Sequence, residues 1–176
     1  MNRTSPVFNV DKPRAARVVY LNKLDIGGPV IITRATEYAI RALLYLARQP
    51  RGEIVYKKDI CSHQNITPAF LTKILQPLIK EGIVGSQRGV GGGFYLRKDP
   101  AEVTLFDVVV AQEGPLYLNE CLSDGDLCRR TLFCPVHGAW REVRDEMTAI
   151  LKRYNFAQLA QQEMCNLEEL KAGVSK

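Results

Sequence analysis

Residues 67–96 read TPAFLTKILQPLIKEGIVGSQRGVGGGFYL, and the order of features in this stretch determines the architecture of the chain. Threonine is a favoured N-cap residue and proline is favoured at the first helical position, so Thr67 and Pro68 predict the start of a helix. Apolar residues then recur at helical spacing as far as Gly82, which predicts the end of the helix. Pro77 lacks an amide proton, and we therefore expect a kink or an early end at that point.

A β-hairpin is predicted directly after this helix. Residues 83–87 and 93–96 are short strand-like runs, and the glycine-rich segment 88–92 joins them. Glycine adopts the backbone angles of tight turns without steric strain, so the tip of this hairpin can come close to another molecule.

Two further helices are predicted before the Thr-Pro helix. The first is a strong amphipathic helix that Thr33 or Thr36 can cap and that ends before Pro50, and the second is a short helix around 57–63. Three helices followed by a glycine-tipped hairpin are typical of a winged helix-turn-helix domain. We therefore predict this domain for residues 30–100.

The predicted domain indicates recognition of double-stranded DNA. A projecting helix of this kind fits the major groove, with its N-terminal residues nearest to the base edges. The hairpin brings an arginine close to the minor groove or to the phosphates. The DNA-contacting residues predicted on these grounds are Thr67, Pro68, Ala69, Thr72, Lys73, Arg88 and Gly89.

Charge is distributed unevenly along the 176 residues, whose net charge is +5. Residues 1–29 carry a net charge of +3, residues 30–100 carry +6 and residues 101–176 carry −4. A basic first half joined to an acidic second half suggests a polyanion-binding module with a separate dimerisation or sensing module. Hydrophobic residues make up 46% and charged residues 24% of the chain, which excludes disorder as its main state.

Residues 101–165 are predicted to contain a ligand-binding loop and dimerisation helices. A short apolar helix is expected at 105–112 and a loop at about 114–134. A long amphipathic helix over 135–154 and a terminal helix over 156–164 follow. The predicted fold class is therefore mainly α with a small β-hairpin wing, a winged helix-turn-helix domain plus a long C-terminal dimerisation helix.

The two ends of the chain are predicted to lie outside these units. Residues 1–29 contain turn formers and no long apolar period, so we expect a poorly ordered N-terminal extension. Residues 166–176 are expected to form a tail.

Three of the five cysteines, Cys121, Cys128 and Cys134, lie within 14 residues. Clustered thiolates on a loop are soft ligands for a metal ion or an iron–sulfur cluster, and His137 is chemically suited as a fourth ligand. Structural zinc sites usually pair cysteines about two to four residues apart, so gaps of six and five residues fit zinc less well. Iron–sulfur ligation is therefore favoured over zinc and over three adventitious thiols.

Four segments carry a resemblance to a known family: 33–41 (TRATEYAIR), 66–71 (ITPAFL), 78–86 (LIKEGIVGS) and 88–94 (RGVGGGF). Together they resemble the Rrf2 family of bacterial transcription regulators, which includes IscR, NsrR, RirA and CymR. The resemblance covers residues 31–160, and the glycine-rich wing is its most specific part.

The resemblance implies a homodimer whose long C-terminal helices cross, so that two winged domains meet a palindromic operator. It also implies an iron–sulfur cluster on Cys121, Cys128 and Cys134, with the 2Fe–2S type favoured and the 4Fe–4S type as the alternative. The fourth ligand is a histidine matching His137 in some members. In others it is a carboxylate of the partner subunit, matching Glu37.

The sequence therefore predicts a dimeric regulator that senses iron–sulfur status, nitric oxide or redox state through the cluster. The alternative is a cluster-free or zinc-binding member of the family that responds to a metabolite or a partner protein. An enzyme is not predicted, because the sequence has neither a Cys-x-x-Cys pair nor a nucleophile with an adjacent base. The odd cysteine count, without a signal peptide or a long apolar run, leads us to expect a cytoplasmic protein that does not contact membranes.

Overall fold

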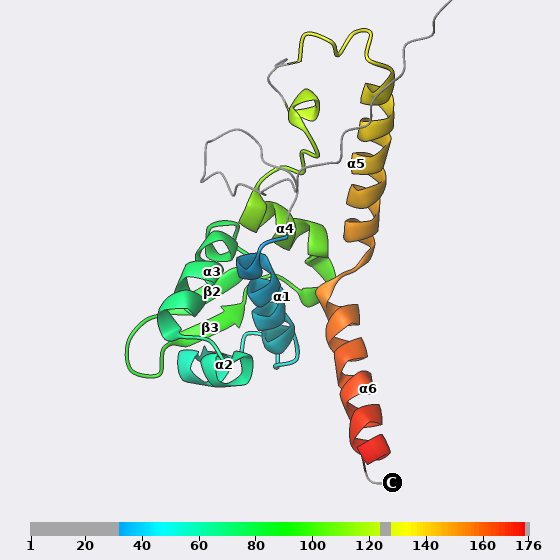
Figure 1. Cartoon of the computed structure of the whole chain (residues 1–176). Coiled ribbons are helices and arrows are strands. Elements are labelled where there is room, and N and C mark those ends of the chain that lie inside the picture. Colours follow the sequence, from blue (N-terminus) through cyan, green and yellow to red (C-terminus); the bar gives the residue numbers. More distant parts are fainter. Residues whose placement is uncertain (1–31, 124–127, 175–176) are drawn as a thin grey trace, which may run out of the picture.

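A computed structural model describes residues 32–123 and 128–174 (Figure 1). The predicted extension over 1–29 lies outside the described residues. The elements, in chain order, are α1 (Arg34–Ala47), β1 (Val55–Tyr56), α2 (Lys57–Gln64), α3 (Pro68–Lys80), β2 (Val84–Gln87), β3 (Gly93–Leu96), the 3-10 turn η1 (Pro100–Glu102), α4 (Leu105–Glu113), the 3-10 turn η2 (Glu120–Leu122), α5 (Pro135–Arg153) and α6 (Phe156–Val174).

The helices α1 and α3 begin where the sequence predicts. Thr33 is the N-cap of α1, and its hydroxyl accepts a hydrogen bond from the amide of Thr36 at 3.4 Å. Thr67 caps α3 in the same way by accepting from the amide of Phe70 at 3.3 Å, and Pro68 is the first helical residue. These side chains satisfy amide donors that have no partner within the helix, which confirms both predicted starts.

The expected early end at Pro77 is wrong, because α3 continues beyond it. Leu75 and Leu78, on either side of the proline, are fully buried. Burying a leucine is worth about 1.5–3 kcal/mol, so the pair offsets the roughly 3 kcal/mol that proline costs inside a helix. In the turn before the proline, the side-chain amide of Gln112 also donates to the carbonyl of Ile74 at 2.6 Å.

The predicted hairpin is confirmed, and a third strand joins it. β2 and β3 pair in antiparallel fashion, with Val84 opposite Leu96 and Gln87 opposite Gly93. β1 pairs with the other side of β3, so the strand order is β1-β3-β2. The sequence pattern does not predict β1, because a strand of two residues has no periodic signal.

Beyond the hairpin, the chain forms α4, a loop and two long helices. In Figure 1, α5 rises clear of the N-terminal domain, while α6 continues in nearly the same direction at the other end. The first part of α6 packs along α1 and η1. α6 extends past Met164 to Val174, so most of the segment 166–176 that is predicted as a tail is helical. The glutamate, leucine and lysine residues in this segment are good helix formers, which explains the extension.

The core lies between α1, α3, α4 and the sheet, and the first turn of α6 closes it. Its largest fully buried side chains include Leu43, Ile60, Leu71, Ile74, Leu75, Leu78, Val108 and Phe156. This mainly helical architecture with a small winged sheet confirms the predicted fold class. Within the two described ranges, no helix is both long and apolar enough to cross a membrane.

Gly93→Ala should destabilise the protein. A Cβ atom at Gly93 would lie 2.0 Å from the carbonyl oxygen of Val55, so β1 would have to move away from β3. Overpacking of this kind costs about 1–3 kcal/mol, which thermal unfolding followed by circular dichroism would detect as a lower melting temperature. An unchanged melting temperature would contradict the register of β1 on β3.

Gly173→Ala is the matched control for this experiment. No atom lies within 4 Å of the corresponding Cβ position. Alanine is a better helix former than glycine, so the melting temperature of this variant should not fall.

Candidate nucleic-acid interface and metal-ligand loop

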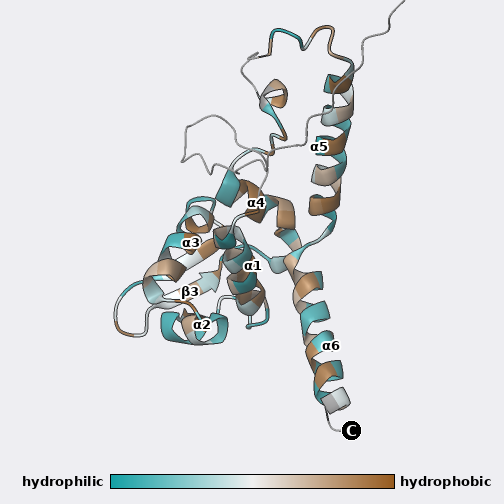
Figure 2. Ribbon diagram, viewed as in Figure 1, coloured by the Kyte–Doolittle hydropathy of each residue, from teal (hydrophilic) through white to brown (hydrophobic). Residues whose placement is uncertain are grey.

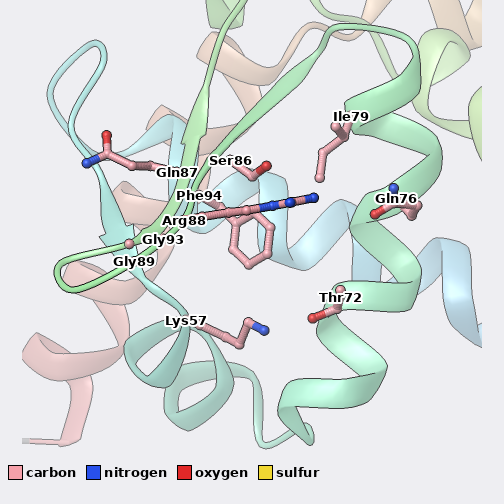
Figure 3. A pocket seen from close by; sticks show the side chains of 11 residues that line it. Lys57, Thr72, Gln76, Ile79, Ser86, Gln87, Arg88, Gly89, Gly93 and Phe94 are labelled. Carbon is pink, nitrogen blue, oxygen red and sulfur yellow. The ribbon is translucent and has the colours of Figure 1, made fainter.

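A hollow of about 470 Å³ lies between α3 and the wing, which is the hairpin of residues 84–96 (Figure 3). Its lining residues are Lys57, Thr72, Gln76, Ile79, Ser86, Gln87, Arg88, Gly89, Gly92, Gly93 and Phe94. Two of these residues are basic and none of them is acidic. The hollow is therefore suited to an anionic partner.

Basic side chains reach into the hollow from two elements. Lys57 is the first residue of α2, and its ammonium group points into the hollow. Arg88 follows β2, and its guanidinium group extends across the hollow towards α3. Thr72 and Gln76 lie one turn apart on α3 and face the hollow from the opposite wall. Cations can bind the phosphates of a nucleic acid, and hydrogen-bonding groups facing them can contact phosphates or base edges.

Glycine shapes the tip of the wing. Gly89 and Gly91 have φ angles of +94° and +82°, which side chains rarely allow. The amide of Gly92 donates to the carbonyl of Gly89 at 3.0 Å and closes the turn. Val90 is fully exposed at the tip, so the wing projects into solvent.

The seven residues predicted to contact DNA fall into two groups. Three of them line the hollow, namely Thr72, Arg88 and Gly89. The other four are exposed at the N-cap and on the first two turns of α3, outside the lining, and are Thr67, Pro68, Ala69 and Lys73. The two groups together extend from the start of α3 to the wing.

Four polar residues of the hollow were not predicted: Lys57, Gln76, Ser86 and Gln87. Gln76 could have been found from the helical repeat, since it lies one turn after Thr72 on α3. Lys57 could not have been found in this way, because its position depends on the pairing of β1 with β3.

The cysteine loop, residues 114–134, holds the three predicted thiol ligands. Cys121 lies in η2, Cys128 lies on the loop, and Cys134 is the N-cap of α5. All three are half-buried free thiols. Among residues 32–123 and 128–174, no three His, Cys, Asp or Glu side chains lie close enough together to hold a metal ion. The structure therefore does not bring the predicted ligands into one site, and their assignment stays a prediction.

His137 has surroundings that suit a metal ligand. It lies one turn after Cys134, and its amide donates to the carbonyl of Cys134 at 3.3 Å. Its Nδ1 atom is buried and has no hydrogen-bond partner among the described residues. Buried polar atoms in proteins are nearly always satisfied, so an imidazole nitrogen in this state fits coordination by a metal centre. Thiols and an imidazole together fit an iron–sulfur cluster chemically.

Glu37, the other predicted ligand, is exposed in the first turn of α1. Its carboxylate forms an ion pair with Arg41, one turn further along the helix. The guanidinium group of Arg41 also lies 5.1 Å from the centre of the Tyr38 ring. The structure therefore holds Glu37 on the surface of its own helix.

The remaining two cysteines lie in different environments. Cys61 is buried in α2, where desolvation raises the pKa of its thiol although Lys57 acts in the opposite direction. A buried thiol of this kind behaves as a small core residue. Cys165 is exposed on α6.

An apolar stripe is exposed along α5, and no residue of this helix is buried. Figure 2 shows hydrophobic residues recurring along it. Together with exposed apolar residues just beyond both ends of the helix, the stripe comprises Leu132, Phe133, Val136, Trp140, Val143, Ile150 and Tyr154. Soluble monomers rarely expose a continuous apolar surface of this kind, so the stripe indicates a protein interface.

Comparison with known proteins identifies the family and the fold described above. The sequence profile of Rrf2, described as an iron-dependent transcriptional regulator, matches residues 32–162. The chain belongs to the Rrf2 family. Rrf2 proteins are transcriptional regulators rather than enzymes, so the chain is a DNA-binding transcriptional regulator with a winged helix-turn-helix fold.

Curated relatives and a solved structure agree with this assignment. The chain is 32% identical over 142 residues to the HTH-type transcriptional regulator NsrR of Halalkalibacterium halodurans, covering 80% of this chain and 94% of that protein. It is 30% identical over 128 residues to the regulator IscR of Cronobacter sakazakii, covering 73% and 78%. The structure of CymR (YrzC), the global cysteine regulator of B. subtilis, matches with a TM-score of 0.60 and 26% identity, covering 75% of this chain and 97% of that chain.

Lys57→Ala and Arg88→Ala should each weaken the binding of this Rrf2 protein to DNA. Each variant removes one cation from the hollow, so the slope of log affinity against log salt concentration should fall by about 1. Fluorescence anisotropy over a salt series, with a duplex selected from genomic fragments by the wild-type protein, measures both effects. Wild-type affinity should itself fall roughly 10³–10⁵-fold between about 50 and 200 mM salt if about 6–10 phosphates are contacted.

Lys171→Ala is the matched control, because Lys171 lies near the end of α6, away from α3 and the wing (Figure 1). Its DNA affinity and salt slope should equal those of the wild type. If Lys57→Ala and Arg88→Ala also left the slope unchanged, the hollow would not be part of the DNA interface.

Proposed function

We propose that this Rrf2 protein is a homodimeric regulator that senses iron–sulfur status, nitric oxide or redox state through an iron–sulfur cluster. The observation that carries the cluster is the buried Nδ1 atom of His137, which has no partner among the described residues. Cys121, Cys128 and Cys134 are free thiols in the same loop region and would supply the other ligands. We favour the 2Fe–2S type, in which imidazole ligands are well known.

His137 is the better supported of the two candidate fourth ligands. The alternative is Glu37 of the partner subunit, which the family resemblance implies. Within its own chain Glu37 is paired with Arg41, but an exposed ion pair is worth at most about 1 kcal/mol. The preference for His137 therefore rests on its unsatisfied nitrogen, which costs free energy unless a partner binds it.

Binding of a cluster by these ligands would link η2 to the start of α5. Cys121 lies in η2, while Cys134 and His137 belong to the first turn of α5, and η2 and α5 are already in contact. A bound cluster supplies iron that nitric oxide, oxidants or iron shortage can alter or remove. When the ligands are free, Cys121 in η2 is no longer linked through the cluster to the start of α5, and the relative placement of two winged domains in a dimer can change.

DNA recognition would involve both α3 and the wing. The exposed residues at the start of α3 would enter the major groove, as in other helix-turn-helix proteins. Lys57 and Arg88 would bind phosphates that approach the hollow, and the projecting wing tip would contact the minor groove or the backbone. Two such units related by a twofold axis would match a palindromic operator.

Dimerisation would cover the apolar stripe of α5. Trp140 and Val143 are 43% and 49% exposed in the single chain, and Ile150 is 44% exposed. Pairing α5 with the same helix of a second copy would remove these side chains from water, which is worth about 25 cal/mol for each Å² of apolar surface.

Anaerobically purified full-length protein should absorb visible light and contain iron, and Cys134→Ser should lose both properties because a thiolate ligand is removed. Cys165→Ser is the matched control, since this thiol is exposed on α6, and it should keep both. Absorption spectra, iron analysis and Mössbauer spectroscopy measure the outcome. Colourless, iron-free wild-type protein would contradict the cluster, and bound zinc in its place would support the zinc-binding alternative.

Two further variants in the same experiment separate the candidate fourth ligands. His137→Ala should lose iron more readily than the wild type, while Glu37→Ala should retain it. The opposite result would assign the fourth position to Glu37.

The double variant Val143→Glu/Ile150→Glu should be monomeric, because it places two charges within the apolar stripe. Light scattering after size-exclusion chromatography measures the molar mass. Ala149→Glu is the control, as Ala149 is exposed on the other side of α5, and it should remain dimeric. A dimeric double variant would show that the stripe is not the dimer interface.

A further inference from the structure

Glu113, the last residue of α4, is hydrogen-bonded to the start of α1. Its Oε1 atom accepts from the amide of Thr33 at 3.0 Å and from the hydroxyl of Thr33 at 2.7 Å. It also accepts from the hydroxyl of Thr36, whose side chain is fully buried. One carboxylate oxygen thus connects helices whose contacting residues are 77 and 80 positions apart in the sequence.

These hydrogen bonds go beyond what capping of α1 requires. Thr33 already caps the helix by accepting from the amide of Thr36. The carboxylate of Glu113 adds charge-assisted hydrogen bonds, and it places a negative charge at the positive end of the α1 dipole. Replacing Glu113 would therefore loosen the connection between α4 and α1 while leaving the local cap in place.

Glu113 lies where the cysteine loop leaves α4. The residue before it, Gln112, donates to the carbonyl of Ile74 in α3 at 2.6 Å. The residue after it, Gly114, begins the loop with a φ angle of +84°. Glu37 lies in the first turn of α1, next to the residues that Glu113 binds. The origin of the cysteine loop is therefore hydrogen-bonded both to the DNA-reading helix α3 and to the start of α1.

We infer that Glu113 is a positioning residue that transmits the state of the cysteine loop to the DNA-binding helices. While the hydrogen bonds of Glu113 are intact, a displacement of the cysteine loop also displaces α1 and, through α4, α3. Without them, the loop can move while α1 stays in place. This inference rests on the proposed function, because it requires a cluster whose loss alters the loop.

The test compares DNA affinity between the iron-loaded and the iron-free state of each full-length variant. In the wild type, the ratio of the two dissociation constants should be about fivefold or more, as is typical of coupled sites. In Glu113→Ala the ratio should fall to within about twofold of one. In Thr36→Val, which keeps the two hydrogen bonds from Thr33 to Glu113, the ratio should fall part of the way, and both variants should keep wild-type visible absorbance and iron content. Thr36→Val keeps the shape of the buried side chain and removes only its hydroxyl, so it should fold even if Glu113→Ala does not.

Two matched variants should keep the wild-type ratio. Thr36→Ser retains the hydroxyl that donates to Glu113. Glu102→Gln changes an exposed glutamate on η1 that lies outside this set of hydrogen bonds. A purely structural role of Glu113 would lower the stability of the variants without removing the difference between the two iron states.

A second measurement needs no cluster. In iron-free protein, hydrogen exchange in the first turn of α1 should be faster in Glu113→Ala than in the wild type, because the amide of Thr33 loses its acceptor. Exchange in Glu102→Gln should be unchanged. Equal exchange in all three proteins would overturn the proposed connection.

The possible failures are distinguishable. A wild-type ratio of five or more that persists in Glu113→Ala and Thr36→Val would overturn the role of Glu113 alone. Loss of iron from both variants would also overturn it, since Glu113 would then act on ligation. Wild-type protein that binds no iron would overturn the cluster proposal together with this inference.

Discussion

Close packing around α1 holds the winged helix-turn-helix unit and the C-terminal helices together. Ala39 and Ala42 on this helix are fully buried, and side chains of this size allow neighbouring helices to approach closely. α1 contacts α2, α3 and β3 of the winged unit, and it also contacts α4 and α6. The winged unit therefore shares one core with α4 and the start of α6. A movement of the C-terminal helices can therefore be transmitted to the winged unit through packed elements that deform little.

α4 lies between the winged unit and the C-terminal helices in the chain, and it is hydrogen-bonded to other elements at both of its ends. At its start, the amide of Leu105 donates to the carbonyl of Tyr154, and the amide of Phe156 donates to the carbonyl of Val103, both at 2.9 Å. These bonds fix α4 to the junction between α5 and α6. At its end, Glu113 fixes it to α1. The exposed stripe of α5 and the cysteine loop are thus attached to opposite ends of one short helix.

Much of the N-terminal domain could be predicted because its signals are local. Thr67 and Pro68 define a helix start through capping chemistry, and the glycines of the wing define a turn through their backbone freedom. Lys57 could not be placed, because its position depends on a strand of two residues. The candidate metal site could be predicted only as a set of ligand types, since the spacing of Cys121 and Cys134 does not determine whether the loop brings them together. The hydrogen bonds of Glu113 could not be predicted either, because its partners Thr33 and Thr36 are distant in the sequence.

Measuring DNA affinity with and without iron tests the proposed coupling between the cysteine loop and the DNA-binding helices directly. Wild-type protein would be titrated anaerobically with one genomic duplex at constant salt concentration, first with its iron, then after chelation, and again after reconstitution with iron and sulfide. The dissociation constant should change by about fivefold or more on chelation and return on reconstitution. Equal dissociation constants in the iron-loaded and iron-free states would contradict the coupling between the cysteine loop and the DNA-binding helices.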